Sequence, residues 1–291
     1  MKDVRSLAVL EDDIDKLKDW LIKQPHLPHD IDNEILCCFI YGTKSLEIAK
    51  QKLDSYFTIR TNHPKLFEFS VRDPLDPAFM KANSATRKFF LEGTTPEGYR
   101  VLFHNLTPTF NECFLHSQEI IKSLMFIEMA MQKWPDMKGL YLAYDIKGMD
   151  ASVLPKLSPT VLASGLEWFQ GSVPVKMKGV LIVNTPPFLE KALDWLLKPF
   201  LKPKLFARLK LTSEDRDCVQ KYLPIDIIPS DYGGKGTKSS EELAEEWGAV
   251  MESKRSWFER TSKQIVDEKK RPPDVKDTYG IQGTFRKLAL D

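Results

Sequence analysis

Residues 173–208 hold the pattern that most limits how this chain can fold. An apolar segment typical of a buried strand, residues 179–184, is followed by a Thr-Pro-Pro break and then by a segment that is apolar over most of its surface at helical spacing. This helix, expected over residues 188–201, confines Glu190, Asp194 and Lys198 to one narrow stripe. An ordinary surface helix needs only about a third to a half of its circumference apolar. The expected helix is therefore either buried on nearly every side or meets two apolar environments at different times.

Basic residues surround this helix in the sequence. They are Lys176, Lys178, Lys198, Lys202, Lys204, Arg208 and Lys210. Apolar surface ringed by Lys and Arg is what an anionic bilayer attracts. The pattern leaves two interpretations open, a buried core helix and a lid that contacts a membrane.

The gross composition limits the class of protein. A chain of 291 residues with 42% hydrophobic residues can bury the core of one large domain, or of a medium domain with a smaller one. A net charge of +1 argues against nucleic acid as the main partner. The first residues contain no apolar run typical of a signal peptide, and no stretch is long enough to span a membrane. The cysteines fit no metal-binding spacing, so we expect reduced thiols in the cytoplasm.

The hydrophobic periodicity changes along the chain. Residues 9–88 show helical spacing throughout and predict a small module of three or four helices. From residue 98, strands expected over residues 99–106, 139–145 and 179–184 alternate with helices over 117–134 and 158–170. Almost wholly apolar strands that alternate with helices indicate an α/β fold with a mostly parallel sheet covered on both sides. A charged helix is expected over residues 239–270.

Motifs of enzymes are scarce. Residues 234–239 resemble a phosphate-binding loop only briefly, because Pro229 stands where the first glycine is required. His104 and His116 could flank a hydrolase site, and Asp145 could act as a general base, but ordinary structural roles are the better interpretation of each. We therefore expect a protein that is not an enzyme, with no catalytic residue, metal or cofactor.

Four sequence blocks resemble the CRAL-TRIO family. They are residues 34–60, 138–148, 169–188 with 198–201, and 223–234, and together they span roughly residues 8–250. The resemblance implies a CRAL-TRIO fold, with a helical module over residues 1–88, a lipid-binding domain over 89–245 and a charged helical C-terminal region over 246–291. The match is nearest to the branch that resembles tocopherol transfer proteins. One departure is the run Cys37 to Gly42, where relatives usually carry arginines.

The resemblance also implies a gated lipid pocket. Its walls would be formed by Ile120, Ser123, Ile127, Leu140, Trp168, Phe169, Val173, Val180, Ile182 and Leu193. The gate would be the helix from Phe188 to Leu201, with apolar contacts from Phe188, Leu189, Trp195, Leu196 and Phe200. We expect a closed apolar cavity of several hundred cubic ångströms, as small-molecule sites usually have. Ser123 is the polar group expected to orient a ligand hydroxyl.

The same resemblance implies a binding site for phosphoinositide headgroups beside the gate. Its cations would be Lys176, Lys178, Lys204 and Arg208. The expected function is a soluble cytoplasmic carrier of one hydrophobic molecule, tocopherol-, retinoid- or carotenoid-like, with transient peripheral attachment to phosphoinositide-containing membranes. Transfer of phosphatidylinositol or another phospholipid, and a non-transporting membrane adaptor, remain alternatives.

Overall fold

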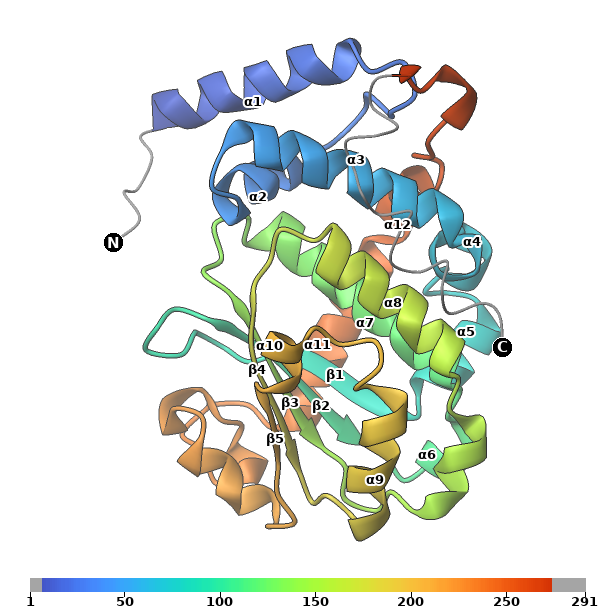
Figure 1. Cartoon of the computed structure of the whole chain (residues 1–291). Coiled ribbons are helices and arrows are strands. Elements are labelled where there is room, and N and C mark those ends of the chain that lie inside the picture. Colours follow the sequence, from blue (N-terminus) through green and yellow to red (C-terminus); the bar gives the residue numbers. More distant parts are fainter. Residues whose placement is uncertain (1–6, 274–291) are drawn as a thin grey trace.

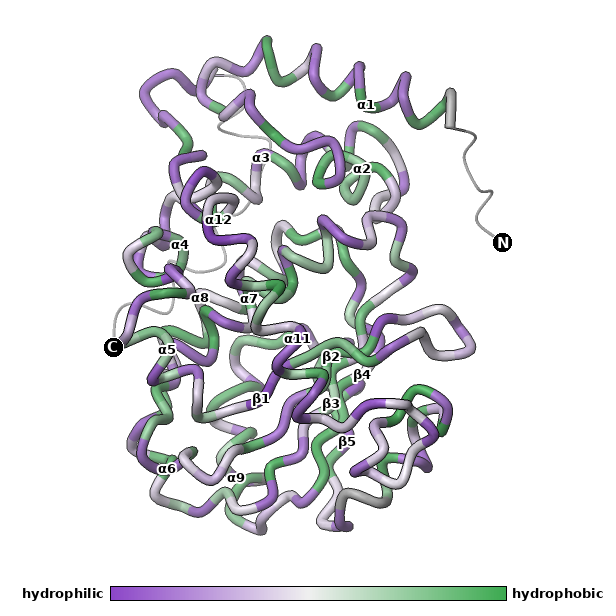
Figure 2. The backbone as a smooth tube through the Cα atoms, turned by 180° about the vertical axis from the view of Figure 1, so that it is seen from behind, coloured by the Kyte–Doolittle hydropathy of each residue, from purple (hydrophilic) through white to green (hydrophobic). Residues whose placement is uncertain are grey.

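The computed structural model describes residues 7–273 of the chain (Figure 1). Its N-terminal part is helical, with α1 (Leu7–Ile22), α2 (Asn33–Gly42), α3 (Leu46–Asn62) and the short α4 (Pro64–Phe67). On α1, Ile14, Leu17 and Leu21 are buried at a spacing of three to four residues, which places them on one helical face. Figure 2 shows hydrophobic and hydrophilic stretches alternating along α1. The expected helical module is therefore present.

The first strand of the sheet begins earlier than the sequence analysis predicts. After the 3-10 turn η1 (Phe69–Val71) and helix α5 (Pro77–Asn83), strand β1 covers Thr86–Phe90. The prediction of helix up to residue 88 is wrong here. β1 owes its conformation to antiparallel pairing with β2, for example between Phe89 and Phe103. Local periodicity in a segment of five residues could not reveal this pairing.

The sheet has five strands in the order β1-β2-β3-β4-β5. Strands β2 (Arg100–Leu106), β3 (Leu140–Asp145), β4 (Met177–Val183) and β5 (Leu209–Leu211) run parallel to one another, and β1 alone is antiparallel. The connections contain α6 (Phe110–Cys113), α7 (His116–Lys133), η2 (Ala151–Lys156), α8 (Pro159–Gly171), α9 (Pro187–Leu196) and α10 (Pro203–Phe206). The α/β fold with a mostly parallel sheet and an N-terminal helical module is confirmed.

Residues at paired positions define the two faces of the sheet. His104, Tyr144 and Ile182 lie side by side on one face, which α7 and α9 partly cover and which we call the α9 face. Phe103, paired with Ala143, belongs to the opposite face. There the ring of Tyr232 packs on Phe103 with centroids 4.9 Å apart. Figure 1 shows α9 crossing in front of the sheet and α11 behind it.

The C-terminal part of the described chain returns to the N-terminal helices. It runs through η3 (Arg216–Lys221), η4 (Ile225–Ile227), η5 (Ser230–Tyr232), α11 (Ser240–Ser253), α12 (Arg255–Ser262) and η6 (Glu268–Lys270). The single helix expected over residues 239–270 is interrupted at Lys254, so that prediction is wrong in its extent. After the interruption, Trp257 and Arg260 both donate hydrogen bonds to Asp32, at 2.5 and 2.6 Å. Residues 274–291 of the expected C-terminal region, and residues 1–6 of the module, lie outside the described part.

A close approach of two backbones holds the N-terminal module on the sheet domain. Gly42, the last residue of α2, lies against Pro174 in the loop before β4. A β-carbon built on Gly42 would stand 2.3 Å from the Pro174 carbonyl oxygen, closer than real contacts allow. Only glycine fits at this position without a shift of the loop.

Glu128 of α7 is fully buried between two guanidinium groups. Its carboxylate accepts hydrogen bonds from Arg60 of α3 and from Arg72, which follows η1. The Tyr56 hydroxyl donates to the same carboxylate, at 2.8 Å. Arg60 also donates to the carbonyl oxygen of Thr261 on α12, at 3.0 Å. One carboxylate thus connects the N-terminal helices, the sheet domain and the C-terminal helix.

Replacement of Glu128 by alanine should destabilise the whole molecule. The change leaves two buried guanidinium groups without a counterion, and loss of one partner from a buried pair costs about 3–5 kcal/mol. Chemical denaturation measures the free energy of unfolding. Lys263→Ala is the control, since its ion pair with Glu259 is exposed and such pairs contribute about 0–1 kcal/mol. Equal stability of the two variants would contradict a central role for Glu128.

Candidate functional site

Helix α9 packs on the sheet through one face only. Leu189, Ala192, Leu193 and Leu196 are buried, and three of them form a small cluster with Ile182 of β4 and with Ile146. The helix ends at Leu196 rather than at the expected Leu201. Pro199 explains the early end, because proline lacks an N–H donor and disfavours helical geometry in the residue before it.

The outer side of α9 carries one large exposed apolar residue. Trp195 is 48% exposed, with Lys191 and Asp194 also exposed on α9. Of the remaining residues expected in the gate, Phe188 and Phe200 are half-buried. The helix therefore leaves part of its apolar surface uncovered, chiefly at Trp195.

The α9 face of the sheet is incompletely covered. Leu142 and Tyr144 of β3 and Val180 of β4 are only half-buried, although both strands have a neighbour on each side. On the opposite face of the same strands, Ala143 and Leu181 are almost completely buried. The helices that cover the α9 face therefore leave the centre of the sheet partly accessible to solvent.

The predicted wall residues divide between two hydrophobic clusters. Ile182 and Leu193 belong to the cluster beneath α9, and Val180 packs against it. The others belong to the main core or pack against it, apart from Ser123; they are Ile120, Ile127, Leu140, Trp168, Phe169 and Val173. Of these residues, Trp168 differs most from its expected role as a pocket wall. Its ring contacts Tyr56 and Phe67 of the N-terminal helices, with centroids 5.6 and 5.4 Å apart.

A buried polar cluster lies beside the uncovered part of the α9 face. The Lys88 ammonium of β1 contacts Glu119 of α7 at 2.6 Å and donates to Ser123 at 2.6 Å. Ser123 in turn donates to the Glu119 carbonyl oxygen, at 2.8 Å. Burial favours the neutral form of Glu119, but Lys88 and His104 outweigh it and hold the Glu119 pKa well below its usual value. The Ser123 hydroxyl thus already donates one hydrogen bond and accepts one within the protein.

His104 is the neutral member of this cluster. Burial, together with the Lys88 ammonium, lowers the pKa of His104 to about 3. Its Nδ1 lies 3.4 Å from a Glu119 oxygen, and its Nε2 has no hydrogen-bond partner within residues 7–273. Sequence reasoning considered His104 only as a possible catalytic group and missed Lys88 and Glu119. The sequence could have indicated Glu119, because this residue lies on the buried side of α7, one turn before Ser123.

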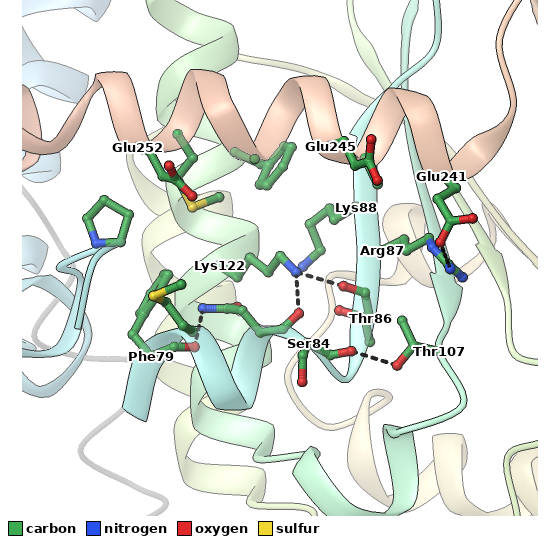
Figure 3. A pocket seen from close by; sticks show the side chains of 17 residues that line it. Phe79, Ser84, Thr86, Arg87, Lys88, Thr107, Lys122, Glu241, Glu245 and Glu252 are labelled. Atoms are coloured by element: carbon green, nitrogen blue, oxygen red, sulfur yellow. Dashed lines mark hydrogen bonds and ion pairs between the residues drawn. The ribbon is translucent and has the colours of Figure 1, made fainter. Parts of the chain in front are cut away.

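A separate cleft of about 320 Å³ opens between α5, β1, α7 and α11 (Figure 3). Its inner side carries Lys122, whose ammonium donates to the carbonyl oxygens of Asn83 and Thr86 at 2.9 and 2.8 Å. Glu241, Glu245 and Glu252 lie along its α11 side, as Figure 3 shows. None of the ten predicted wall residues lines this cleft.

The predicted headgroup cations lie around the first residues of β4 and β5. These strands are parallel neighbours, so Lys178 and Arg208 stand at adjacent strand starts. Lys178 lies over the ring of Tyr99, with its ammonium 4.7 Å from the centroid. Arg208 donates to the carbonyl oxygen of Met177. Lys176 and Lys204 are exposed.

Lys52 of α3, which the sequence did not connect with this basic region, lies close to Lys202. Lys52 donates to the carbonyl oxygens of Gly171 and Val173, at 3.4 and 3.2 Å. Burial and the charge of Lys202 lower the pKa of Lys52 to about 8. Gln170 holds the chain before α10, because its side chain donates to Phe200 and accepts from the Lys202 N–H, both at 2.9 Å.

Within residues 7–273, no helix has the length and apolar character needed to cross a bilayer. The same part of the chain contains no cluster of three or more His, Cys, Asp or Glu side chains arranged to hold a metal ion.

Comparison with known families identifies the domain that carries this face. Residues 84–234 match the model described as CRAL/TRIO domain, which begins just before β1. The chain therefore belongs to the CRAL/TRIO domain family. Residues 8–79 match the model described as Pinta-like, UBA domain.

Similar proteins include two groups of curated relatives. The mouse (Mus musculus) alpha-tocopherol transfer protein-like is 26% identical over 255 residues, which are 82% of this chain and 68% of that protein. Rat (Rattus norvegicus) clavesin-1 is 25% identical over 230 residues, 78% of this chain and 64% of that protein. The crystal structure of Sfh5 aligns with a TM-score of 0.46 and 15% identity, over 87% of this chain and 98% of that chain.

The low pKa of His104 predicts an imidazole that stays neutral in mildly acidic solution. In a titration of isotope-labelled protein from pH 8 to pH 5, followed by NMR, the His104 ring shifts should remain constant, because the pKa of about 3 lies below the whole range. A His104→Gln variant assigns the signal, and free imidazole in the sample is the internal standard. A His104 midpoint near the ordinary value of about 6.5 would contradict the described burial.

Proposed function

We propose that this protein carries one hydrophobic small molecule between membranes, held on the α9 face of the sheet beneath α9. The observation that carries the proposal is the partial exposure of Leu142, Tyr144 and Val180 at the centre of the sheet. Apolar surface that stays uncovered inside a domain raises the free energy of the folded protein, and a bound ligand that fills the space removes this penalty. Membership of the CRAL/TRIO family and the name of the mouse relative support a lipid of tocopherol-like character.

The wall of this pocket consists of the predicted residues that face the space. Val180 and Ile182 form its floor, Leu193 its α9 side, and Ile120 and Ser123 its α7 side. The remaining wall predictions, Ile127, Leu140, Trp168, Phe169 and Val173, support the pocket from the main core. Because they belong to the main core and not to the cluster beneath α9, we infer that they lie behind the surface that the cargo touches.

The segment from Phe188 to Leu201 acts as the gate in this proposal. Its buried residues form a cluster with Ile146 and Ile182 that is separate from the main core. Displacement of α9 therefore exposes a few side chains, at roughly 1.5–3 kcal/mol for each large one, and leaves the core intact. Trp195 and Leu196 would enter the membrane interface in the open state, which lowers the cost of opening.

The basic region around Lys176, Lys178, Lys204 and Arg208 would attach the protein to phosphoinositide headgroups. Lys204 lies on α10, which follows the gate directly, so attachment and opening involve one continuous segment. Lys52 and Lys202 add positive charge at the same edge. The proposed setting is the cytoplasm, with transient peripheral attachment to membranes.

Three parts of the chain would divide this work. Residues 89–245 would bind the cargo, the described part of residues 1–88 would brace α7 and α8, and the described part of residues 246–291 would fasten the module to the sheet domain. The bidentate pair of Arg255 with Asp73, at 2.8 and 2.7 Å, supports this role of the last part.

Val180→Trp should displace the cargo. The larger side chain fills the space above the sheet, so the purified variant should contain only a small fraction of the lipid that co-purifies with wild type. Organic extraction and mass spectrometry measure that lipid, and thermal unfolding checks the fold. Ile265→Trp is the control, because it adds the same ring at a residue that is 61% exposed.

The outcomes separate the alternatives. If a folded Val180→Trp protein contains as much lipid as wild type, the pocket lies elsewhere in the molecule. Absence of bound lipid from wild type as well would favour a non-transporting adaptor, and a bound phospholipid would favour phospholipid transfer.

Lys204→Glu should weaken binding to liposomes that contain phosphoinositide. A basic residue near an anionic surface contributes about 1 kcal/mol, so reversal of its charge should weaken binding by roughly tenfold or more. Lys65→Glu is the control, since Lys65 is exposed on α4, away from the basic region. Liposome flotation at two salt concentrations measures the effect. Equal binding by both variants would exclude α10 from the membrane contact.

A further inference from the structure

Tyr144 carries a hydroxyl on the apolar face of the sheet that has no hydrogen-bond partner in the described part of the chain. It lies on the central strand β3, between His104 of β2 and Ile182 of β4. Its hydroxyl forms no hydrogen bond with any residue in the described range 7–273, and its side chain is only half-buried beneath α9. A hydroxyl in an apolar interior costs free energy unless it is hydrogen-bonded. Tyr144 therefore presents a free donor and acceptor to the space above the sheet.

The second unpartnered polar group lies directly beside it. The rings of His104 and Tyr144 pack with centroids 4.3 Å apart, and Nε2 of the buried His104 lacks a hydrogen-bond partner among the described residues. Leu142 and Val180, next to Tyr144 on the same face, are apolar. The polar atoms of this face thus concentrate at one end of an otherwise apolar surface.

The charges around Tyr144 indicate which polar group of a ligand can bind beside it. Burial, and then the negative charge of Glu119, raise the pKa of Tyr144. The Lys88 ammonium is fully buried and already contacts Glu119 and Ser123. The Lys122 ammonium is bonded to backbone carbonyl oxygens beside the other cleft. An anionic headgroup at Tyr144 would therefore lie near a carboxylate, and both ammonium groups are otherwise engaged.

We propose that Tyr144 binds the polar end of the cargo, and that this end is a neutral hydroxyl group rather than a carboxylate or phosphate. The inference rests on the proposed carrier function and names the class of ligand for the same site. The ligand hydroxyl exchanges hydrogen bonds with the Tyr144 phenol, while its apolar body lies over Leu142 and Val180. Tyr144 is thus a residue that determines specificity between lipid alcohols and lipid acids.

The test compares lipids that differ only in their head. Purified wild type is incubated with phosphatidylcholine vesicles that contain equal amounts of octadecan-1-ol, octadecanoic acid and octadecane, then re-isolated, and the captured lipid is quantified by mass spectrometry. Wild type should capture the alcohol in preference to the acid. Tyr144→Phe removes one oxygen atom and should reduce capture of the alcohol by about three- to tenfold, the effect of one neutral hydrogen bond, with capture of octadecane unchanged.

Tyr141→Phe is the matched control. Tyr141 lies on the same strand, on the opposite face, so its hydroxyl cannot reach the cargo and the preference for the alcohol should persist. Thermal unfolding of the three proteins confirms that each is folded.

Two results would overturn the inference in distinguishable ways. If wild type captures the acid as well as the alcohol, or if Tyr144→Phe keeps the full preference, the assignment of Tyr144 fails while the carrier function stands. If wild type captures none of the three lipids, the carrier function fails and the inference fails with it.

Discussion

The burial of Glu128 between Arg60 and Arg72 is the interaction on which the rest of the structure depends. Two guanidinium groups and one carboxylate are costly to remove from water, and they are tolerated only where geometry and further hydrogen bonds compensate. Burial lowers the pKa of Arg72 well below its ordinary value, and the charge of Arg60 lowers it further. Arg60 also packs on the ring of Phe67, and Arg72 on that of Phe258, at 4.9 and 5.1 Å from the centroids. These groups come from three distant segments, so the site is satisfied only when all three have assembled.

This interaction ties together one side of the molecule, whereas α9 on the other side packs on a smaller, separate cluster. Helices α7 and α8 are fixed between the sheet and the N-terminal module, whereas α9 rests on a small separate cluster and has an exposed tryptophan. The Gln170 side chain forms two hydrogen bonds to the segment that follows α9. In the proposed mechanism, movement of α9 therefore breaks few contacts and does not disturb the core that holds the floor of the pocket.

The sequence predicts those elements whose burial pattern is local. The strands around Leu142 and Leu181 were predictable because each is apolar at nearly every position, as central strands of a parallel sheet usually are. Strand β1 was not, because its conformation depends on pairing with β2. In the site, the family resemblance grouped Lys178 with Arg208, but Lys52 of α3 comes close to Lys202 only through the tertiary fold. Contacts between distant segments likewise decide that Trp168 lies among N-terminal side chains. They also decide that the Tyr144 hydroxyl finds no hydrogen-bond partner among the described residues.

Transfer of a lipid between membranes tests the central claim most directly. Purified protein is mixed with donor liposomes that contain a fluorescent tocopherol analogue and a quencher, and with acceptor liposomes that contain phosphoinositide but no quencher. Fluorescence rises as the analogue leaves the quencher. The proposed function predicts a rate proportional to protein concentration and faster than spontaneous transfer. A rate equal to that without protein, measured with protein shown to hold an extractable lipid, would contradict the carrier function and leave only that of a stationary binding module.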